Sequence, residues 1–217
     1  MMRLMIFLVL IICSTACFSQ SRFLELDQNS LGLDIGYSTD KNRDIDGITG
    51  TIGYSSWGLL DLGISFSRVS VRGAFYGGKE YYSTISPYLS YLVMKQDSNN
   101  PISIGFSVSY QKTFTENFDV IGSHVVVGPG FFADLKLSNE FFMQPNASFA
   151  FLIGKSEDIY SSNYSQEQND SMFLSNIGFA FVFVNDADKS IFALNPAIAF
   201  QKDTTLFGLS ASMLFIL

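Results

Sequence analysis

The sequence predicts an all-β protein in which about ten antiparallel strands close into an up-and-down barrel that crosses a membrane. Large apolar residues alternate with small or polar residues along most of the chain, most regularly between positions 102 and 111. A period of two places these sets on opposite faces of a strand. Charged residues make up 15% of the chain, whereas a soluble domain usually carries about 25%. The apolar faces are therefore predicted to contact lipid, and the small polar faces to line the lumen.

The N-terminus is predicted to be a cleaved signal peptide. Arg3 is followed by an apolar run and then by small residues up to Ala16, which is the order of charge, apolar core and cleavage zone in a secretory signal. The run is shorter than the roughly 20 apolar residues that a membrane-spanning helix requires. We expect cleavage after Ser19, with residues 1–19 as the signal peptide and residues 20–217 as the barrel domain. No later stretch is long and apolar enough for a membrane helix, so insertion is expected through strands.

Both cysteines, Cys13 and Cys17, lie in the predicted signal peptide. The processed chain is therefore expected to contain neither a disulfide nor a thiol site. Cys17 has a second interpretation, because residues 14–17 faintly match the lipoprotein box of bacteria, in which the cysteine is lipidated. Ser14 stands where that box has a large aliphatic residue, so a signal-peptide cysteine that is discarded is the favoured interpretation.

Composition excludes several function classes. The chain carries 13 Lys and Arg against 20 Asp and Glu, with a net charge of −7. Nucleic-acid binding requires a basic face, which this sequence lacks. The acidic residues of the predicted outer loops show no spacing typical of metal ligands. These residues are Asp44, Asp46, Glu157, Asp158, Glu167 and Asp170. We therefore expect no nucleic-acid partner, no metal and no cofactor.

The first five strands are predicted at about 30–39, 47–55, 59–71, 81–94 and 102–114. Each has an apolar set on one face and ends at a turn or loop signal. The outward sets are, in order, Leu31, Leu33, Ile35 and Tyr37; Ile48, Ile52 and Tyr54; Leu60, Leu62, Ile64 and Phe66; Ile85, Pro87, Leu89, Tyr91 and Val93; and Ile102, Ile104, Phe106, Val108 and Tyr110.

The last five strands are predicted at about 120–137, 141–155, 171–184, 191–201 and 205–217. Their outward sets are, in order, Val125, Val127, Phe131, Ala133 and Leu135; Met143, Ala147, Phe149, Phe151 and Ile153; Ile177, Phe179, Phe181 and Phe183; Phe192, Leu194, Ile198 and Phe200; and Phe207, Leu209, Ala211, Met213, Phe215 and Leu217. A count of ten is favoured, with eight as the alternative.

An even strand count places both termini on the periplasmic side. The longest predicted loop, 156–170, then faces the outside, where long loops belong. Three prolines conflict with the strand placements, because proline cannot donate to a β-ladder. Pro87, Pro129 and Pro196 each lie inside a predicted strand, so a bulge or a shifted boundary is expected at each.

The lumen is predicted to hold a network of polar side chains. Asp34, Asp61, Asp134 and Lys136 have inward parity. Side chains nearly fill a barrel of this size, so paired charges are expected to plug and stiffen the lumen, with a narrow polar channel as the alternative. His124, the only histidine, is also predicted to face the lumen as a hydrogen-bonded side chain.

An enzymatic role is weighed and not favoured. Some outer-membrane barrels hydrolyse lipids with a serine and a histidine. Ser123 is adjacent to His124 but points to the opposite face of a regular strand, so these two residues cannot act as nucleophile and base. No catalytic residue is assigned.

Four cations share outward parity near the outer strand ends: Arg68, Lys112, Lys155 and Lys202. Long cationic side chains at that depth can extend to the phosphates of the outer leaflet. One hypothesis is that they form a partial ring that contacts lipopolysaccharide. The alternative is that they are ordinary hydrated charges at the loop edges.

The processed chain as a whole resembles the small outer-membrane β-barrel proteins of Gram-negative bacteria. The signal ends in Cys17-Phe18-Ser19-Gln20, which is similar to signals common in the Bacteroidota, and the last strand, 207–217, looks like a barrel-terminating strand with Leu217 in place of the usual Phe. The resemblance implies a Bacteroidota-type, porin-like barrel in the bacterial outer membrane. It also implies the outer-membrane lipid, lipopolysaccharide and the barrel-assembly machinery as partners.

Three function classes follow. The favoured class is a non-enzymatic membrane barrel with a structural, adhesive or narrow porin-like role, whose extracellular partner the sequence does not identify. The second is a barrel enzyme that acts on lipid or peptide. The third is a soluble barrel that binds an apolar ligand, with its large residues inward. A water-facing surface rich in Ser and Gly but poor in Lys and Glu is unusual for a soluble protein, so this class ranks last.

Overall fold

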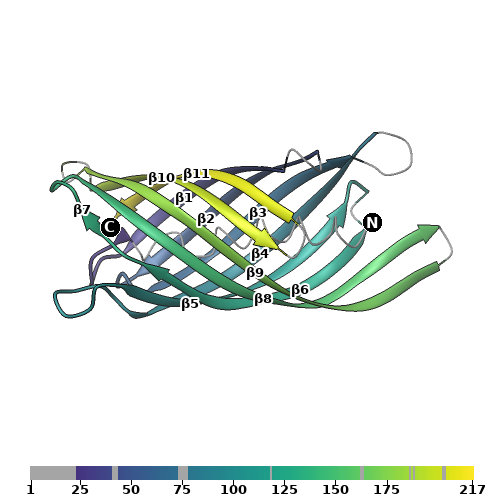
Figure 1. The fold of residues 1–217 in the computed structure, drawn as a ribbon, viewed down its shortest axis with the longest axis horizontal. Coiled ribbons are helices and arrows are strands. Elements are labelled where there is room, and N and C mark those ends of the chain that lie inside the picture. Colours follow the sequence, from purple (N-terminus) through teal and green to yellow (C-terminus); the bar gives the residue numbers. More distant parts are fainter. Residues whose placement is uncertain are drawn as a thin grey trace.

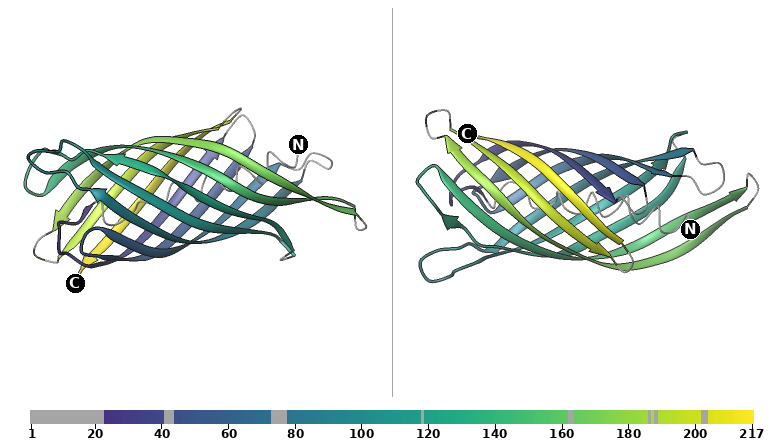
Figure 2. Two further views of the ribbon diagram at one scale, coloured as in Figure 1. Left: turned by 90° about the horizontal axis from the view of Figure 1, so that it is seen from below. Right: turned by 45° about the horizontal axis from the view of Figure 1, so that its top comes forward.

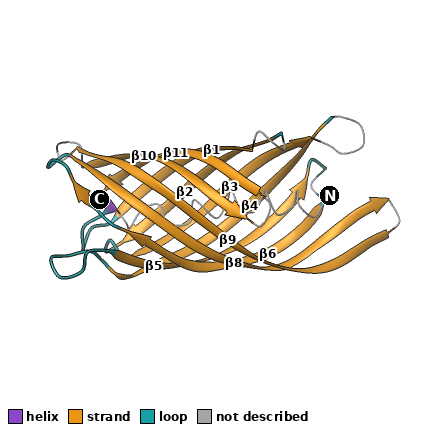
Figure 3. Ribbon diagram, viewed as in Figure 1, coloured by secondary structure: helices purple, strands orange, loops and turns teal. Residues whose placement is uncertain are grey.

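The protein is an all-β closed barrel of ten antiparallel strands, as predicted, with one short additional strand (Figures 1 and 2). The computed structural model describes residues 23–40, 44–72, 78–117, 119–161, 164–185, 187, 189–201 and 204–217. Strands dominate this part of the chain (Figure 3). No described helix is long and apolar enough to cross a bilayer.

The strands follow one another around the barrel in chain order. They are β1 (Ser30–Asp40), β2 (Ile45–Ser56), β3 (Leu60–Arg72), β4 (Lys79–Met94), β5 (Ser103–Thr115), β6 (Val120–Phe132), β7 (Leu135–Lys136), β8 (Phe141–Ser161), β9 (Tyr164–Asn185), β10 (Ser190–Gln201) and β11 (Thr204–Ile216). β6 pairs directly with β8, and β1 pairs with β11 to close the barrel. The two-residue strand β7 pairs with β8 at the edge of the sheet.

The register fixes the stagger of the barrel. The stagger is found by following paired residues from strand to strand around the barrel. Starting at Ile35 on β1 and passing through β2, β3, β4, β5, β6 and β8, this row of pairs reaches Asn169 on β9. In the opposite direction, through β11 and β10, the same row reaches Phe181, twelve residues further along β9. A stagger of twelve over ten strands tilts the strands by about 40° from the barrel axis.

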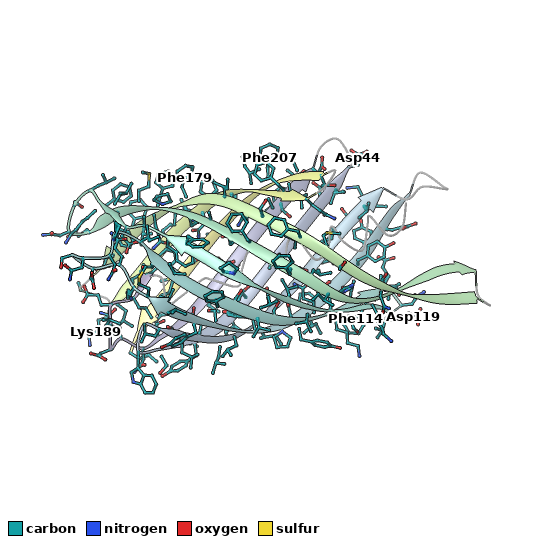
Figure 4. All side chains as sticks on the ribbon, turned by 60° about the horizontal axis from the view of Figure 1, so that its bottom comes forward. Asp44, Phe114, Asp119, Phe179, Lys189 and Phe207 are labelled. Carbon is teal, nitrogen blue, oxygen red and sulfur yellow. The ribbon has the colours of Figure 1, made fainter. Side chains whose placement is uncertain are left out.

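The large apolar side chains face outward, as predicted. On β11, Phe207 and Leu209 are 57% and 55% exposed, whereas Leu206 and Leu214 on the opposite face are buried. Figure 4 shows Phe179 and Phe207 projecting away from the barrel wall. The arrangement of the third function class, with large residues inward and the Ser and Gly set outward, is therefore wrong.

The two ends of the barrel differ. We call the end with the β8–β9 connection the hairpin end and the end with Leu217 the terminus end. Asp44, Phe114 and Asp119 lie toward the hairpin end and Lys189 lies at the terminus end (Figure 4). The segment predicted as the longest loop, 156–170, is mostly strand, because β8 and β9 stay paired from Ser156 and Gln168 to Ser161 and Tyr164. Its backbone forms a hairpin that projects beyond the neighbouring strands (Figure 1).

The prolines are accommodated without the expected bulges. Pro87 pairs with β3, while the β4–β5 ladder is interrupted between Ile85 and Tyr88 and resumes in the same register. The β6–β8 ladder is interrupted at Pro129 and the β9–β10 ladder at Pro196, and both ladders also resume in the same register. On its other side, each of these prolines stays paired, Pro129 with β5 and Pro196 with β11. Each proline therefore interrupts the hydrogen-bond ladder on one side of its strand only, and the register is the same before and after the interruption.

The predicted sixth strand is too long. β6 ends at Phe132 rather than at residue 137, and the chain leaves the β-ladder before the short strand β7. The amide of Ala133 donates to the carbonyl of Pro145 at 3.2 Å, which begins the return to β8. Because the strand stops, the inward and outward parity of residues 133–137 no longer follows that of β6.

Candidate functional site in the barrel interior

The middle of the lumen is polar and hydrogen-bonded across strands. Ser212 on β11 donates to the Asp34 carboxylate on β1 at 2.6 Å, and Asn195 on β10 donates to Ser212 at 3.5 Å. Ser90 on β4 donates to Asp61 on β3 at 3.1 Å. Both aspartates are buried as predicted. Each of these two carboxylates therefore accepts a hydrogen bond from a serine on a neighbouring strand.

Asp134 links the terminus ends of three segments. The amide of Gln144 donates to its carboxylate at 2.6 Å, and the amide of Gln96 donates to its backbone carbonyl at 3.1 Å. Lys136, predicted as the cationic member of the lumen network, is instead exposed on β7. Its inward placement is wrong because β6 ends before this residue.

Lys95, rather than Lys136, supplies the positive charge near the carboxylates of Asp61 and Asp134. It follows β4 directly, is half-buried at the terminus end, and its Nζ donates to the carbonyl of Gly58 at 3.4 Å. Burial lowers the pKa of Lys95 to about 8, although the carboxylates of Asp134, Glu25 and Asp61 oppose that shift. The sequence signal for Lys95 was weak, because a lysine at a turn is usually hydrated.

His124 is buried in the β6 wall, close to the hairpin end. It pairs in register with Gln111 on β5 and Gly154 on β8. A Cβ added to Gly154 would lie 2.2 Å from the carbonyl oxygen of Ser123 and 2.5 Å from the His124 ring, so both the β6 backbone and the imidazole require glycine there. Ser123 pairs with Lys112 and Lys155, two residues of outward parity. In the part of the chain that the structure describes, no cluster of three His, Cys, Asp or Glu residues could hold a metal.

The segment before β1 lies against the terminus end of the lumen. Phe23 and Leu24 are buried against a cluster of apolar residues on β9, β10 and β11. The amide of Asp27 donates to the carbonyl of Trp57 at 3.2 Å, and the amide of Leu217 donates to the carbonyl of Asn29 at 2.9 Å. This segment is thus tied to the β2–β3 turn and to the last strand.

A set of buried apolar residues, which we call the apolar layer, lines part of the lumen toward the hairpin end. It combines buried residues from eight of the ten barrel strands. They are Ile45, Val69, Val71, Tyr82, Ile121, Val126, Leu152, Leu174, Ala199 and Leu206. Ile45 begins β2 and Ala199 lies near the end of β10, so the layer lies beyond the polar groups around Asp34 and Asp61.

Three of the four predicted surface cations can be placed. Arg68 is exposed, lies 3.4 Å from the Glu116 carboxylate and stacks over the Tyr81 ring at 4.9 Å. Lys112 is half-buried with its ammonium 5.9 Å from the Phe114 ring, and Lys155 is exposed. The fourth, Lys202, lies outside the described residues.

The chain resembles solved structures in its fold, whereas its sequence matches no known family. No protein-family model and no curated relative matches the chain. Among solved structures, the translocator domain of the autotransporter NalP from Neisseria meningitidis matches with 8% identity over 94% of each chain and a TM-score of 0.56. The beta domain of the Bordetella autotransporter Brka matches with 10% identity over 87% of this chain and 98% of that chain, at 0.50.

This chain has the fold of an outer-membrane β-barrel. A third match, the attachment invasion locus protein Ail of Yersinia pestis, has 9% identity over 89% of this chain and 100% of that chain, with a TM-score of 0.33. The identities of the two autotransporter domains are low, so their likeness to this chain concerns architecture. The resemblance to outer-membrane barrels is therefore confirmed at the level of the fold, without a specific family.

Proposed function

We propose that the protein is an integral barrel of the bacterial outer membrane with a structural or adhesive role, and that its lumen does not conduct ions. The observation that supports closure is the apolar layer, which combines Val, Ile, Leu, Ala and Tyr side chains from eight strands. A narrow apolar constriction repels water and therefore blocks hydrated ions even without contact across the lumen.

The projecting β8–β9 hairpin supports an adhesive role. If both termini are periplasmic, as the even strand count implies, the hairpin end faces the outside. The paired backbone from Ser156 to Gln168 extends the wall beyond β6 and β10, since the last described pair with β6 is at Ser156. A surface element of this kind is suited to contact a partner outside the cell.

A planar-bilayer recording tests the proposed closure. We expect the refolded protein to show no steady open current, because the apolar layer excludes water from the lumen. A triple variant that combines Val69→Ser, Leu152→Ser and Leu174→Ser should wet this layer and produce measurable conductance. The matched control is Ile153→Ser, which alters the outward neighbour of Leu152 and should stay silent. A steady current through the unaltered protein would contradict the proposal.

Contact with lipopolysaccharide is a second proposed property, and one register row favours it. Lys112 on β5 and Lys155 on β8 flank Ser123 on β6 in the same row of paired residues. Two strand spacings separate these lysines by about 10 Å. Phosphates of the outer leaflet could therefore be contacted by both cations from the lipid-facing side.

Charge removal tests this second property. We expect the variant that combines Lys112→Gln and Lys155→Gln to retain at least threefold less lipopolysaccharide during purification, because both favourable charge interactions are lost. Lys189→Gln, at the opposite end of the barrel, is the matched control and should retain the normal amount. Unchanged retention in the double variant would show that these lysines are ordinary hydrated charges.

A further inference from the structure

The β8–β9 hairpin leaves one edge of β9 open. On the β10 side, the pairing of β9 ends where Ser175 meets Phe200, whereas on the β8 side it continues to Tyr164. Among the described residues, none from Tyr164 to Leu174 has a partner on β10. Figures 1 and 2 show this part of the hairpin extending beyond the neighbouring strands. An open strand edge presents backbone N–H and C=O groups that can pair with another chain.

The register shows which backbone groups face this edge. The carbonyl of Pro145 on β8 accepts a hydrogen bond from Ala133, so it points away from β9. Pro145 pairs with Phe179, and the two residues of an antiparallel pair direct their backbone groups either toward each other or both away. Phe179 therefore points its N–H and C=O toward β10, and so does every second residue of β9. On the open part of the strand these residues are Ser165, Glu167, Asn169, Ser171 and Phe173.

This edge lacks the usual protection against pairing. Natural edge strands are commonly blocked by proline, lysine, a bulge or a short length. Residues 164–174 contain no proline, lysine or arginine, and the register irregularity of the hairpin lies on β8, between Ile159 and Ser161. The open stretch also exceeds the typical strand length of about 5–6 residues. The β9 edge can therefore accept a complete additional strand.

Charge selects the occupant of the edge. The hairpin segment 156–174 contains four acidic residues and no lysine or arginine. Glu157 and Glu167 pair directly in the β8–β9 ladder, and like charges in directly opposed positions destabilise a sheet. A second copy of this chain would bring the same acidic segment and add to the repulsion. A strand that carries cations would relieve the repulsion and complete the ladder.

We infer that the β9 edge binds an extended basic segment of a partner protein, which adds a strand to the hairpin. Backbone hydrogen bonds along the edge supply affinity, and lysine or arginine side chains of the segment complement the acidic residues. This inference rests on the proposed adhesive role, because it names the class of partner that the projecting hairpin binds.

Fluorescence anisotropy with a defined peptide tests the edge. The probe has about ten residues of alternating threonine and lysine, because threonine favours strands. The protein is held in nanodiscs of zwitterionic lipid, which leave both ends of the barrel accessible and do not attract the cationic probe. A matched peptide with a methyl group on every second backbone nitrogen retains the charges but loses the donors of one edge. We expect it to bind at least tenfold more weakly, and equal binding of the two peptides would overturn strand addition.

Two double variants separate backbone pairing from charge. Ser165→Pro combined with Ser171→Pro removes two donors from the open edge and should weaken binding of the unmethylated peptide at least tenfold. Glu167→Gln combined with Asp170→Asn should weaken it at least threefold, because half of the acidic charge of the hairpin is lost. The matched control is Asp119→Asn, an exposed carboxylate toward the same end of the barrel, which should leave binding unchanged. Resistance to SDS verifies folding, and Ser171→Pro alone serves if the double variant does not fold. Unchanged binding in both double variants would overturn the inference.

A single cysteine distinguishes failure of this inference from failure of the proposed function. Residues 20–217 contain no cysteine, and Asn169 is exposed. We expect a membrane-impermeant maleimide to label Asn169→Cys on intact cells. Absence of labelling would overturn the outward orientation and the adhesive role with it, whereas labelling without peptide binding in nanodiscs would overturn the edge site alone. Disulfide-linked dimers of this variant that block peptide binding would show that a second copy occupies the edge, which would overturn the basic class of partner.

Discussion

Gly128→Ala is expected to impair folding of the barrel more than any other single-methyl addition considered. Gly128 lies on β6 next to Pro129, where the β6–β8 ladder is interrupted. A Cβ at this position would overlap the carbonyl oxygen of Phe149 and come within 2.7 Å of the Cα of Ala150. The obstacle is backbone, so it cannot move without separating the two strands. We expect a loss of roughly 3 kcal/mol, the upper range for an overpacked site.

Urea unfolding of the refolded protein, followed by its mobility on SDS gels, measures this loss. The control is Gly50→Ala on β2, where an added Cβ meets no atom within 4 Å. That variant should match the unaltered protein, since a methyl group there only enlarges the outer surface. Equal stability of the two variants would mean that β6 and β8 are not as closely packed as the structure shows.

The faces of the strands could be predicted from the sequence because they depend on a local rule. A residue such as Phe207 or Leu209 is outward because its neighbours in the chain are small or polar, and no knowledge of the partner strand is needed. The same rule correctly placed Asp34, Asp61 and His124 in the lumen. It failed at Lys136, because parity has meaning only while the strand continues.

The β8–β9 hairpin shows where the local rule stops. Residues 156–170 lack an apolar alternation, and the sequence therefore indicated a loop. Backbone hydrogen bonds need no apolar face, so a polar segment that projects past the lipid can continue the ladder. The pairing of Ser161 with Tyr164 shows that the ladder extends to the tip of the hairpin.

Most buried polar side chains of the described residues lie on β1 to β5 and most buried apolar ones on β6 to β11, and the closure of the barrel brings these two sides together. Gln111 and Leu174 are 63 positions apart in the chain, and only the register around the whole barrel brings them to one level. Lys95 is similar, because the carboxylates of Glu25 and Asp134 that act on its charge come from distant segments. Such neighbours could not be predicted from the strand pattern of one sequence.

Leu209→Arg is expected to destabilise the barrel in a bilayer by about 2–4 kcal/mol, the cost of a cation on the lipid face near the midplane. Leu209 is exposed in the central part of β11 and pairs with Tyr37 on β1 and Pro196 on β10. For a protein that faces water, this substitution at an exposed leucine would be harmless, so the variant tests the membrane orientation directly. Equilibrium folding into lipid vesicles measures the effect.

Thr205→Arg provides the matched control on the same strand and face. Thr205 is exposed near the hairpin-end start of β11, two outward positions before Leu209. Near the interface an arginine costs only about 0–1 kcal/mol, because its long side chain reaches the headgroups. The decisive measurement is the difference in folding free energy lost between the two arginine variants. A large loss for Leu209→Arg with a small loss for Thr205→Arg requires hydrocarbon around the middle of the wall. Equal, small losses at both positions would instead require water there, and the outer-membrane assignment would then fail.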